Sequence, residues 1–255
     1  MTGPLAKRNL SPAARALLLS LAALLLFAAQ IALSQLGVGV AGLFSYRRVD
    51  PSGAFAWISV HHVAQGAAAL AAMALISLLF KVDFKLGLGD RRAGMRIVLW
   101  FTVIMTAYHI AMGFLLNALS LFKPFAHPVN ARNVLGALAF QLFLSGTSEE
   151  LLFRALPITL LSMIAKSTFS LLRGRVRLPL VVVITALMFS LAHINWSGNP
   201  FRLHYDVLQL LFALAMGIVE GWAYVRTGSV VYPMMMHGIS NGLVTGVAVI
   251  LPAVF

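Results

Sequence analysis

The three glutamates of the chain all lie within apolar segments, and two of them, Glu149 and Glu150, are adjacent. The chain has only 7 acidic residues among 255. A charge at the centre of a bilayer costs roughly 2.5–3.5 kcal/mol, so such residues are usually paired and functional. Arg154 follows Glu150 by four residues, which predicts an ion pair on one helical face. Glu149 has no such local partner, and an unpaired carboxylate in an apolar helix is suited to act as a general base.

Two further apolar segments carry side chains of chemical interest at a spacing of four residues. Phe189 and His193 share a face of one segment, and His237 and Asn241 share a face of the other. Polar faces within lipid turn toward one another or toward a wet cavity, so these segments are expected to meet Glu149 in one buried site. Such a set could activate a water and bind an oxyanion, or it could ligate zinc or another divalent metal through Glu149, His193 and His237.

The composition indicates a multi-pass membrane protein. The chain is 60% hydrophobic and only 10% charged, whereas soluble domains carry about 25% charged residues. Segments of about 20 apolar residues are long enough to cross a bilayer. We therefore predict an all-α, polytopic transmembrane helix bundle of about seven spans, within a range of six to eight. The predicted spans are residues 16–43, 55–80, 97–122, 134–164, 179–194, 205–225 and 229–254.

The distribution of basic residues predicts the orientation of this bundle. With a cytoplasmic N-terminus, most of the lysines and arginines lie in cytoplasmic segments, as the positive-inside rule requires. These are Lys7, Arg8, Arg15, Lys81, Lys85, Arg91, Arg92, Arg96, Lys166, Arg173, Arg175, Arg177 and Arg226. The net charge of +12 is then explained by topology and by contact with anionic lipid. The basic residues are scattered over short loops, so we expect no nucleic-acid partner. The absence of cysteine excludes disulfides and a cysteine nucleophile.

The chemistry is concentrated in the second half of the chain. We predict three spans in residues 1–130, peripheral to the site, and four in residues 131–255 that form the catalytic core. The fourth span must continue through Pro157, with a kink there, if Glu149 is to lie at the depth of His193. His61, His62 and His109 are interpreted as helix contacts, because polar side chains in spans commonly hydrogen-bond across helices.

The three motifs resemble those of the CPBP family of intramembrane proteases, which includes CAAX prenyl endopeptidases and bacteriocin-processing proteins. They are Glu149-Glu150-x-x-x-Arg154, Phe189-x-x-x-His193 and His237-x-x-x-Asn241, in that order and each in an apolar segment. The Gly-rich stretch 217–229 also resembles the family. The resemblance covers roughly residues 134–247, and its value as evidence lies in three motifs occurring in order on predicted helices.

The resemblance implies a role for each motif residue. Glu149 would activate a water, His193 would position or deprotonate that water, and His237 and Asn241 would stabilise the oxyanion. Glu150 would orient this shell through Arg154, and Phe189 would form a wall of the site. No cofactor is favoured, because the His-Glu-x-x-His pair of ordinary zinc proteases is absent.

Glu220 is an additional intramembrane acid that the family motifs do not require. We interpret it as the partner of nearby Tyr224 or Arg226 at the cytoplasmic edge, and alternatively as a second acid lining the substrate entry.

The expected function is that of an intramembrane endopeptidase acting on a membrane-bound protein or peptide in the bilayer of a prokaryotic inner membrane. Candidate substrates are CAAX proteins, bacteriocin precursors and signalling peptides. Two other classes stay open: a non-proteolytic scaffold or immunity protein, and a proton-coupled transporter, which also uses intramembrane Glu and His residues.

Overall fold

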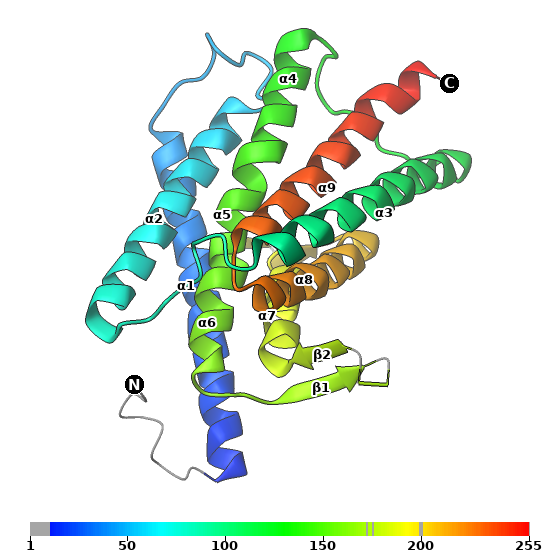
Figure 1. Cartoon of the computed structure of the whole chain (residues 1–255). Coiled ribbons are helices and arrows are strands. Elements are labelled where there is room, and N and C mark those ends of the chain that lie inside the picture. The colour runs from blue at the N-terminus through cyan, green and yellow to red at the C-terminus, as the bar shows by residue number, and fades with distance from the viewer. Residues whose placement is uncertain (1–10, 172, 175, 199–200, 255) are drawn as a thin grey trace.

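The apolar segments form a bundle of helices in the computed structural model, which describes residues 11–254 except 172, 175 and 199–200 (Figure 1). Lys7, Arg8 and Arg175 of the topology argument lie outside these residues. The uninterrupted helices are α1 (Pro12–Gly42), α2 (Ala56–Phe80), α3 (Arg91–Ala118), α7 (Leu180–Leu191), α8 (Val207–Thr227) and α9 (Val231–Ile250). A 3-10 turn at Leu251–Ala253 extends α9.

The predicted fourth span is one continuous helix with two irregular turns. It runs through α4 (Ala131–Phe140), a π segment (Gln141–Ser145), α5 (Gly146–Glu150), a second π segment (Leu151–Ala155) and α6 (Leu156–Ser162). The predicted continuation through Pro157 is therefore confirmed. The deformation expected at Pro157 takes the form of the π segment directly before it. Because π turns inside α-helices are frequent at functional sites, the two turns that flank Glu149 and Glu150 indicate that this stretch is functional.

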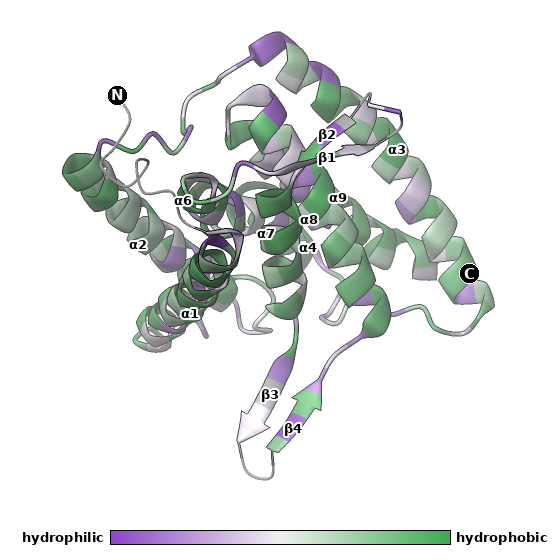
Figure 2. Ribbon diagram, turned by 90° about the horizontal axis from the view of Figure 1, so that it is seen from below, coloured by the Kyte–Doolittle hydropathy of each residue, from purple (hydrophilic) through white to green (hydrophobic). Residues whose placement is uncertain are grey.

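The predicted membrane bundle is confirmed. Among the described residues, five helices are long and apolar enough to cross a bilayer: α1, α2, α3, α8 and the segment from Val231 to Ala253. The continuous helix from α4 to α6, which we call the composite helix, and the shorter apolar α7 bring the bundle to about seven spans. Large apolar side chains cover the outside of the helices, whereas polar ones such as Gln30, Gln65 and Thr185 are buried. Figure 2 shows the predominantly hydrophobic helices.

Two short antiparallel hairpins were not predicted from the sequence. The strands β1 (Thr168–Leu171) and β2 (Val176–Pro179) pair between α6 and α7. The strands β3 (Asn195–Gly198) and β4 (Phe201–His204) pair between α7 and α8, and this second hairpin projects from the bundle (Figure 2). Both hairpins lie in segments that the sequence analysis treated as loops, so they leave the helical fold class unchanged.

A side chain from α1 supports the second π segment. The Leu156 N–H bonds to the Leu151 carbonyl, five residues back, and in that register the next donor would be Pro157, which has no N–H. The Leu152 carbonyl is thereby left without a helical donor. The buried side chain of Gln30 supplies the missing donor, since its Nε2 donates to the Leu152 carbonyl at 2.6 Å. The first helix thus stabilises the turn that carries Arg154.

The loops at one end of the bundle are joined to each other. The Asp90 N–H donates to the Thr227 carbonyl, and the Val230 N–H donates to the Lys85 carbonyl. Arg226 also lies 3.8 Å from the Asp90 carboxylate. The α2–α3 and α8–α9 connections therefore lie on the same side of the bundle, as the predicted alternation of spans requires.

Asp50 organises the opposite connection, between α1 and α2. Its carboxylate accepts hydrogen bonds from the backbone N–H groups of Ala54, Phe55 and Ala56, at 2.7–2.8 Å. Burial opposes ionisation of Asp50, but these backbone donors outweigh it and hold the pKa of the carboxyl below its ordinary value of 3.8. Three N–H groups at the start of α2 thus depend on one carboxylate.

We expect Asp50→Asn to lower the free energy of unfolding in detergent by about 1–2 kcal/mol at neutral pH, as for loss of a helix cap. Because the folded pKa lies below the unfolded one, the advantage of wild type is complete above pH 3.8 and is lost as the pH falls through the folded pKa. Thermal unfolding at several pH values measures this. Asp83→Asn, in an exposed loop ion pair, is the control, and an equal effect of both variants would contradict the prediction.

Candidate active site

The two adjacent glutamates of α5 have different surroundings. Glu149 is partly exposed, at 21% of its side chain, and lines a partly open cavity of about 870 Å³. Glu150 is fully buried behind it. A carboxylate that faces the cavity can meet a water or a substrate, whereas one behind the wall can act only through its neighbours.

Arg154 lies between two buried carboxylates. The ion pair predicted with Glu150 is present, with 3.1 Å between Arg154 Nε and Glu150 Oε2. The guanidinium also hydrogen-bonds Glu220 through Nη2. All three side chains are completely buried. One arginine therefore joins the composite helix to α8 through a pair of acids.

The first interpretation of Glu220, as a partner of Tyr224 or Arg226 at the cytoplasmic edge, is wrong. Tyr224 instead hydrogen-bonds Thr159, and Arg226 faces Asp90. Glu220 is drawn inside because a buried guanidinium requires a counter-charge. The alternative interpretation, a second acid lining the substrate entry, agrees better with the structure, since Glu220 belongs to the wall of the same cavity.

Phe189 lies at the centre of the cationic and imidazole groups. The Arg154 guanidinium carbon is 4.2 Å from the centre of the Phe189 ring, a cation–π geometry. The same ring is met edge-on by His193, at 4.9 Å between ring centres, and by His237, at 5.7 Å. The predicted wall residue thus separates the cavity from the buried arginine and fixes two histidines.

His193 follows the end of α7, and a local hydrogen bond fixes its ring. Its Nδ1 lies 2.9 Å from the Phe189 carbonyl, which can only accept, so Nδ1 carries the proton. The neutral ring then has an unshared electron pair on Nε2. Since His193 lines the cavity, this nitrogen is available to a water there.

His237 lies against all three glutamates of the chain. Its Nδ1 is 2.8 Å from Glu150 Oε1 and 3.9 Å from Glu220 Oε2, and its Nε2 is 3.5 Å from Glu149 Oε2. Nδ1 donates to the Glu150 carboxylate, which leaves Nε2 facing the cavity side. Glu150 therefore orients His237 directly, as well as pairing with Arg154.

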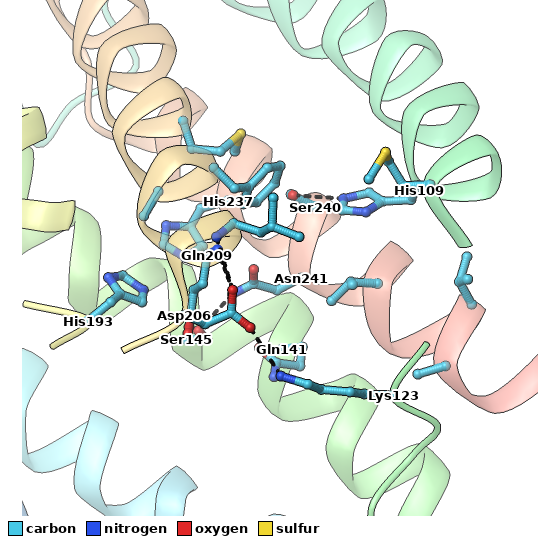
Figure 3. Close-up of a pocket in the computed structure, with 18 of the residues that line it drawn as sticks. His109, Lys123, Gln141, Ser145, His193, Asp206, Gln209, His237, Ser240 and Asn241 are labelled. Atoms are coloured by element: carbon cyan, nitrogen blue, oxygen red, sulfur yellow. Dashed lines mark hydrogen bonds and ion pairs between the residues drawn. The ribbon is translucent and has the colours of Figure 1, made fainter. Parts of the chain in front are cut away.

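Asn241 is held one helical turn beyond His237 on α9. Its Nδ2 donates to Ser145 Oγ at 3.0 Å, and Ser145 belongs to the first π segment (Figure 3). One of the two amide hydrogens is used in this bond, so the other remains to donate into the cavity.

Small residues allow α9 to approach the composite helix closely enough to form this site. A Cβ added to Gly146 would lie 2.9 Å from the backbone nitrogen of Gly238, and one added to Gly238 would collide with the Leu142 carbonyl. Contact through glycine is common where membrane helices pack closely. Gly146 precedes Glu149 by one turn and Gly238 follows His237, so this contact brings the first and third motifs together.

The structure thus brings all seven predicted residues to one place. Those on the cavity wall are Glu149, Phe189, His193, His237 and Asn241. Glu150 and Arg154 lie behind the wall and reach the cavity through His237 and Phe189. Their catalytic roles stay predictions.

The cavity wall also includes residues that sequence reasoning did not assign to the site. His62 of α2 contacts Ser148, as expected of a helix contact, but it also lies 3.9 Å from Glu149. His109 of α3 contacts Ser240 in the same cavity (Figure 3). The available signal was the occurrence of these histidines in otherwise apolar spans. Only the packing of α2 and α3 reveals where they point.

The proposed metal ligands do not fit a metal site well. Among the described residues, the group that converges at ligand spacing is Glu150, Glu220 and His237, and not Glu149, His193 and His237. The guanidinium of Arg154 already occupies the place of a cation between Glu150 and Glu220. A divalent ion there would be repelled by that charge, so no catalytic step is assigned to a metal.

The fold and site define a multi-pass membrane protein with a carboxylate–imidazole centre beside a partly open cavity. Residues 131–243 match the family model described as type II CAAX prenyl endopeptidase, Rce1-like. This segment contains every predicted site residue, and the matched family agrees with the resemblance of the three motifs to CPBP intramembrane proteases. In general terms this match supports an intramembrane endopeptidase of the CAAX type. Searches of curated proteins and of solved structures gave no match to the chain.

We expect Gly238→Ala to force α9 away from the composite helix, because its Cβ would collide with the Leu142 carbonyl. Overpacking of this kind costs about 1–3 kcal/mol. Gly246→Ala on the same helix is the matched control, since a Cβ there meets nothing within 4 Å. Thermal unfolding in detergent measures both variants, and equal stability of the two would contradict this packing.

We expect Glu220→Gln to destabilise the protein by about 3 kcal/mol or more, because it leaves half of the charge pairing of Arg154 unmade in a buried site. Arg226→Gln, which breaks an exposed pair on the same helix, should cost at most about 1 kcal/mol. Denaturation of both variants in detergent provides the comparison. Equal losses would show that Glu220 does not contribute as a buried ion.

Proposed function

We propose that the protein hydrolyses a peptide bond of a membrane-bound substrate by means of a water activated by Glu149. One observation carries this proposal: Glu149 faces the cavity beside the Nε2 atom of His237, while Glu150 and Arg154 are buried behind it. A general base must be within reach of a water and of the group that stabilises the charge it creates.

In the proposed reaction, the Glu149 carboxylate removes a proton from water as the water oxygen attacks the peptide carbonyl carbon. His193, which lies on the wall of the same cavity, helps to position the water. The carbonyl oxygen becomes an oxyanion. Glu149 then returns the proton to the leaving amine as the C–N bond breaks, so that a carboxylic acid and an amine are formed.

The oxyanion would be held by Asn241 and His237. Asn241 has one amide hydrogen beyond that used by Ser145, and the position of its side chain is fixed by that bond. The ring of His237 is fixed by Glu150, and in its imidazolium form, balanced by that carboxylate, it can donate from Nε2–H to the oxyanion. Donors fixed in advance in a cavity of low polarity stabilise developing charge without reorganising, which is a large contribution to catalysis.

The proposed substrate is a protein or peptide bound at the membrane. A CAAX-type substrate follows from the family, and bacteriocin precursors and signalling peptides remain alternatives. We propose a prokaryotic inner membrane, with the N-terminus cytoplasmic. The linked α2–α3 and α8–α9 loops support this orientation, since Lys81 and Lys85 lie in the first loop and Arg91 and Arg226 at the helix ends beside the loops.

The test is cleavage in liposomes of a library of membrane-tethered peptides, with prenylated and unprenylated CAAX sequences as separate arms. Loss of a general base costs about 10²–10⁴-fold, so Glu149→Gln and His193→Ala should each lower kcat by at least 10²-fold. Thr147→Val, an exposed position in the same helix, is the control. Mass spectrometry of the products identifies the bond that is cleaved.

Each reaction is repeated with a strong chelator. Activity that survives chelation but not Glu149→Gln supports water activation by glutamate. Activity that is lost on chelation and restored by zinc would assign the same residues to a metal. A folded wild-type protein that cleaves no member of the library would favour the scaffold or transporter class over the protease.

A further inference from the structure

We propose that His62 is a further catalytic residue, which holds the attacking water together with Glu149. The inference rests on the proposed function and concerns the same cavity. It assigns a chemical role to α2, a helix outside the part of the chain that matches the family model.

His62 is brought to the site by close packing of α2 on α5. A Cβ added to Gly66, one turn further along α2, would lie 3.3 Å from the Ser148 Cβ, so the two helices approach closely there. The ring of Phe140 meets the His62 ring edge-on at 5.0 Å. Both His62 and Phe140 line the cavity with Glu149, and the His62 side chain is only 8% exposed.

The ring orientation of His62 follows from its bond to Ser148. Nδ1 lies 2.6 Å from Ser148 Oγ, and the Ser148 hydroxyl itself lies in donor geometry to the Ser145 carbonyl at 3.4 Å. With its hydrogen directed to that carbonyl, the Ser148 oxygen accepts from Nδ1–H. The unshared pair of His62 is then on Nε2, the nitrogen that faces Glu149.

The separation of Nε2 from Glu149 suits a water between them. His62 Nε2 and Glu149 Oε1 are 3.9 Å apart, which is too long for a direct hydrogen bond. One water at about 2.8 Å from each atom fits this separation, since hydrogen bonds of that length can meet at a single oxygen. Such a water would donate one hydrogen to Glu149 and the other to His62.

The two oxygens of Glu149 face different histidines. Oε2 is 3.5 Å from His237 Nε2, on the side of the buried network, and Oε1 faces His62. The two carboxylate oxygens of Glu149 therefore have different surroundings and different roles. His237 links Glu149 to Glu150, and His62 is on the side where a water can bind.

The neighbouring histidine provides a natural contrast. His61 is as buried as His62, but it stacks on Trp57 at 5.6 Å and packs beside Gly37 of α1. It does not belong to the wall of the cavity. A change at His61 perturbs the same helix without touching the proposed water.

The test compares His62→Asn with His62→Gln in the peptide-cleavage assay. Asparagine places an amide near the position of Nδ1 and keeps the bond to Ser148, whereas glutamine reaches toward the position of Nε2. We expect His62→Asn to lower kcat by roughly 10²-fold with KM nearly unchanged, and His62→Gln to recover part of that loss. The His61 ring lies 5.0 Å from the His62 ring, but His61→Gln leaves the Nε2 atom of His62 in place and should cost much less in kcat than His62→Asn.

A second measurement does not depend on cleavage. In protein labelled with ¹⁵N-histidine, Glu149→Gln should shift the imidazole signals of His62 more than those of His61. His62→Asn with full kcat, or with a loss confined to KM, would overturn the inference while the proposed function stands. A wild-type protein without peptidase activity would overturn both, and unshifted His62 signals would refute the contact with Glu149 itself.

Discussion

The buried guanidinium of Arg154 is the interaction on which the rest of the structure depends. It has no access to water, so its charge must be balanced by Glu150 and Glu220 and by the face of Phe189. These partners come from the composite helix, α8 and α7. Satisfying one charge therefore fixes three helices relative to one another. The same carboxylates then face His237, and through it α9 is held in register with Glu149.

The helix that carries the two glutamates is not regular. The composite helix carries a π segment on each side of the two glutamates, and each has a compensating contact from another helix. Gln30 donates to the carbonyl left without a partner by Pro157, and Asn241 donates to Ser145 in the first π segment. The irregular turns thus couple the local geometry of Glu149 to α1 and α9. Helices without motifs consequently contribute to the geometry of the site.

Much of the site could be predicted because each motif is local. The i, i+4 spacing of Glu150 and Arg154 predicted their ion pair, and the shared faces of the other two motifs predicted which side chains would meet. The partner of Glu220 was predicted incorrectly, because only residues close to it in the sequence, Tyr224 and Arg226, were considered. Arg154 lies 66 residues away and is reached only through the packing of α8 on the composite helix.

The sequence by itself determined the membrane bundle and the order of its spans, and it predicted the seven residues that the structure brings together at the candidate site. The physical reason is that hydrophobic length and helical periodicity are properties of single segments. Tertiary structure alone decided which glutamate faces the cavity, which acid shares Arg154, and that His62 of α2 lies beside Glu149. These outcomes depend on the rotation and separation of helices, which are set by small residues at contacts such as Gly146 with Gly238. No single segment encodes that geometry.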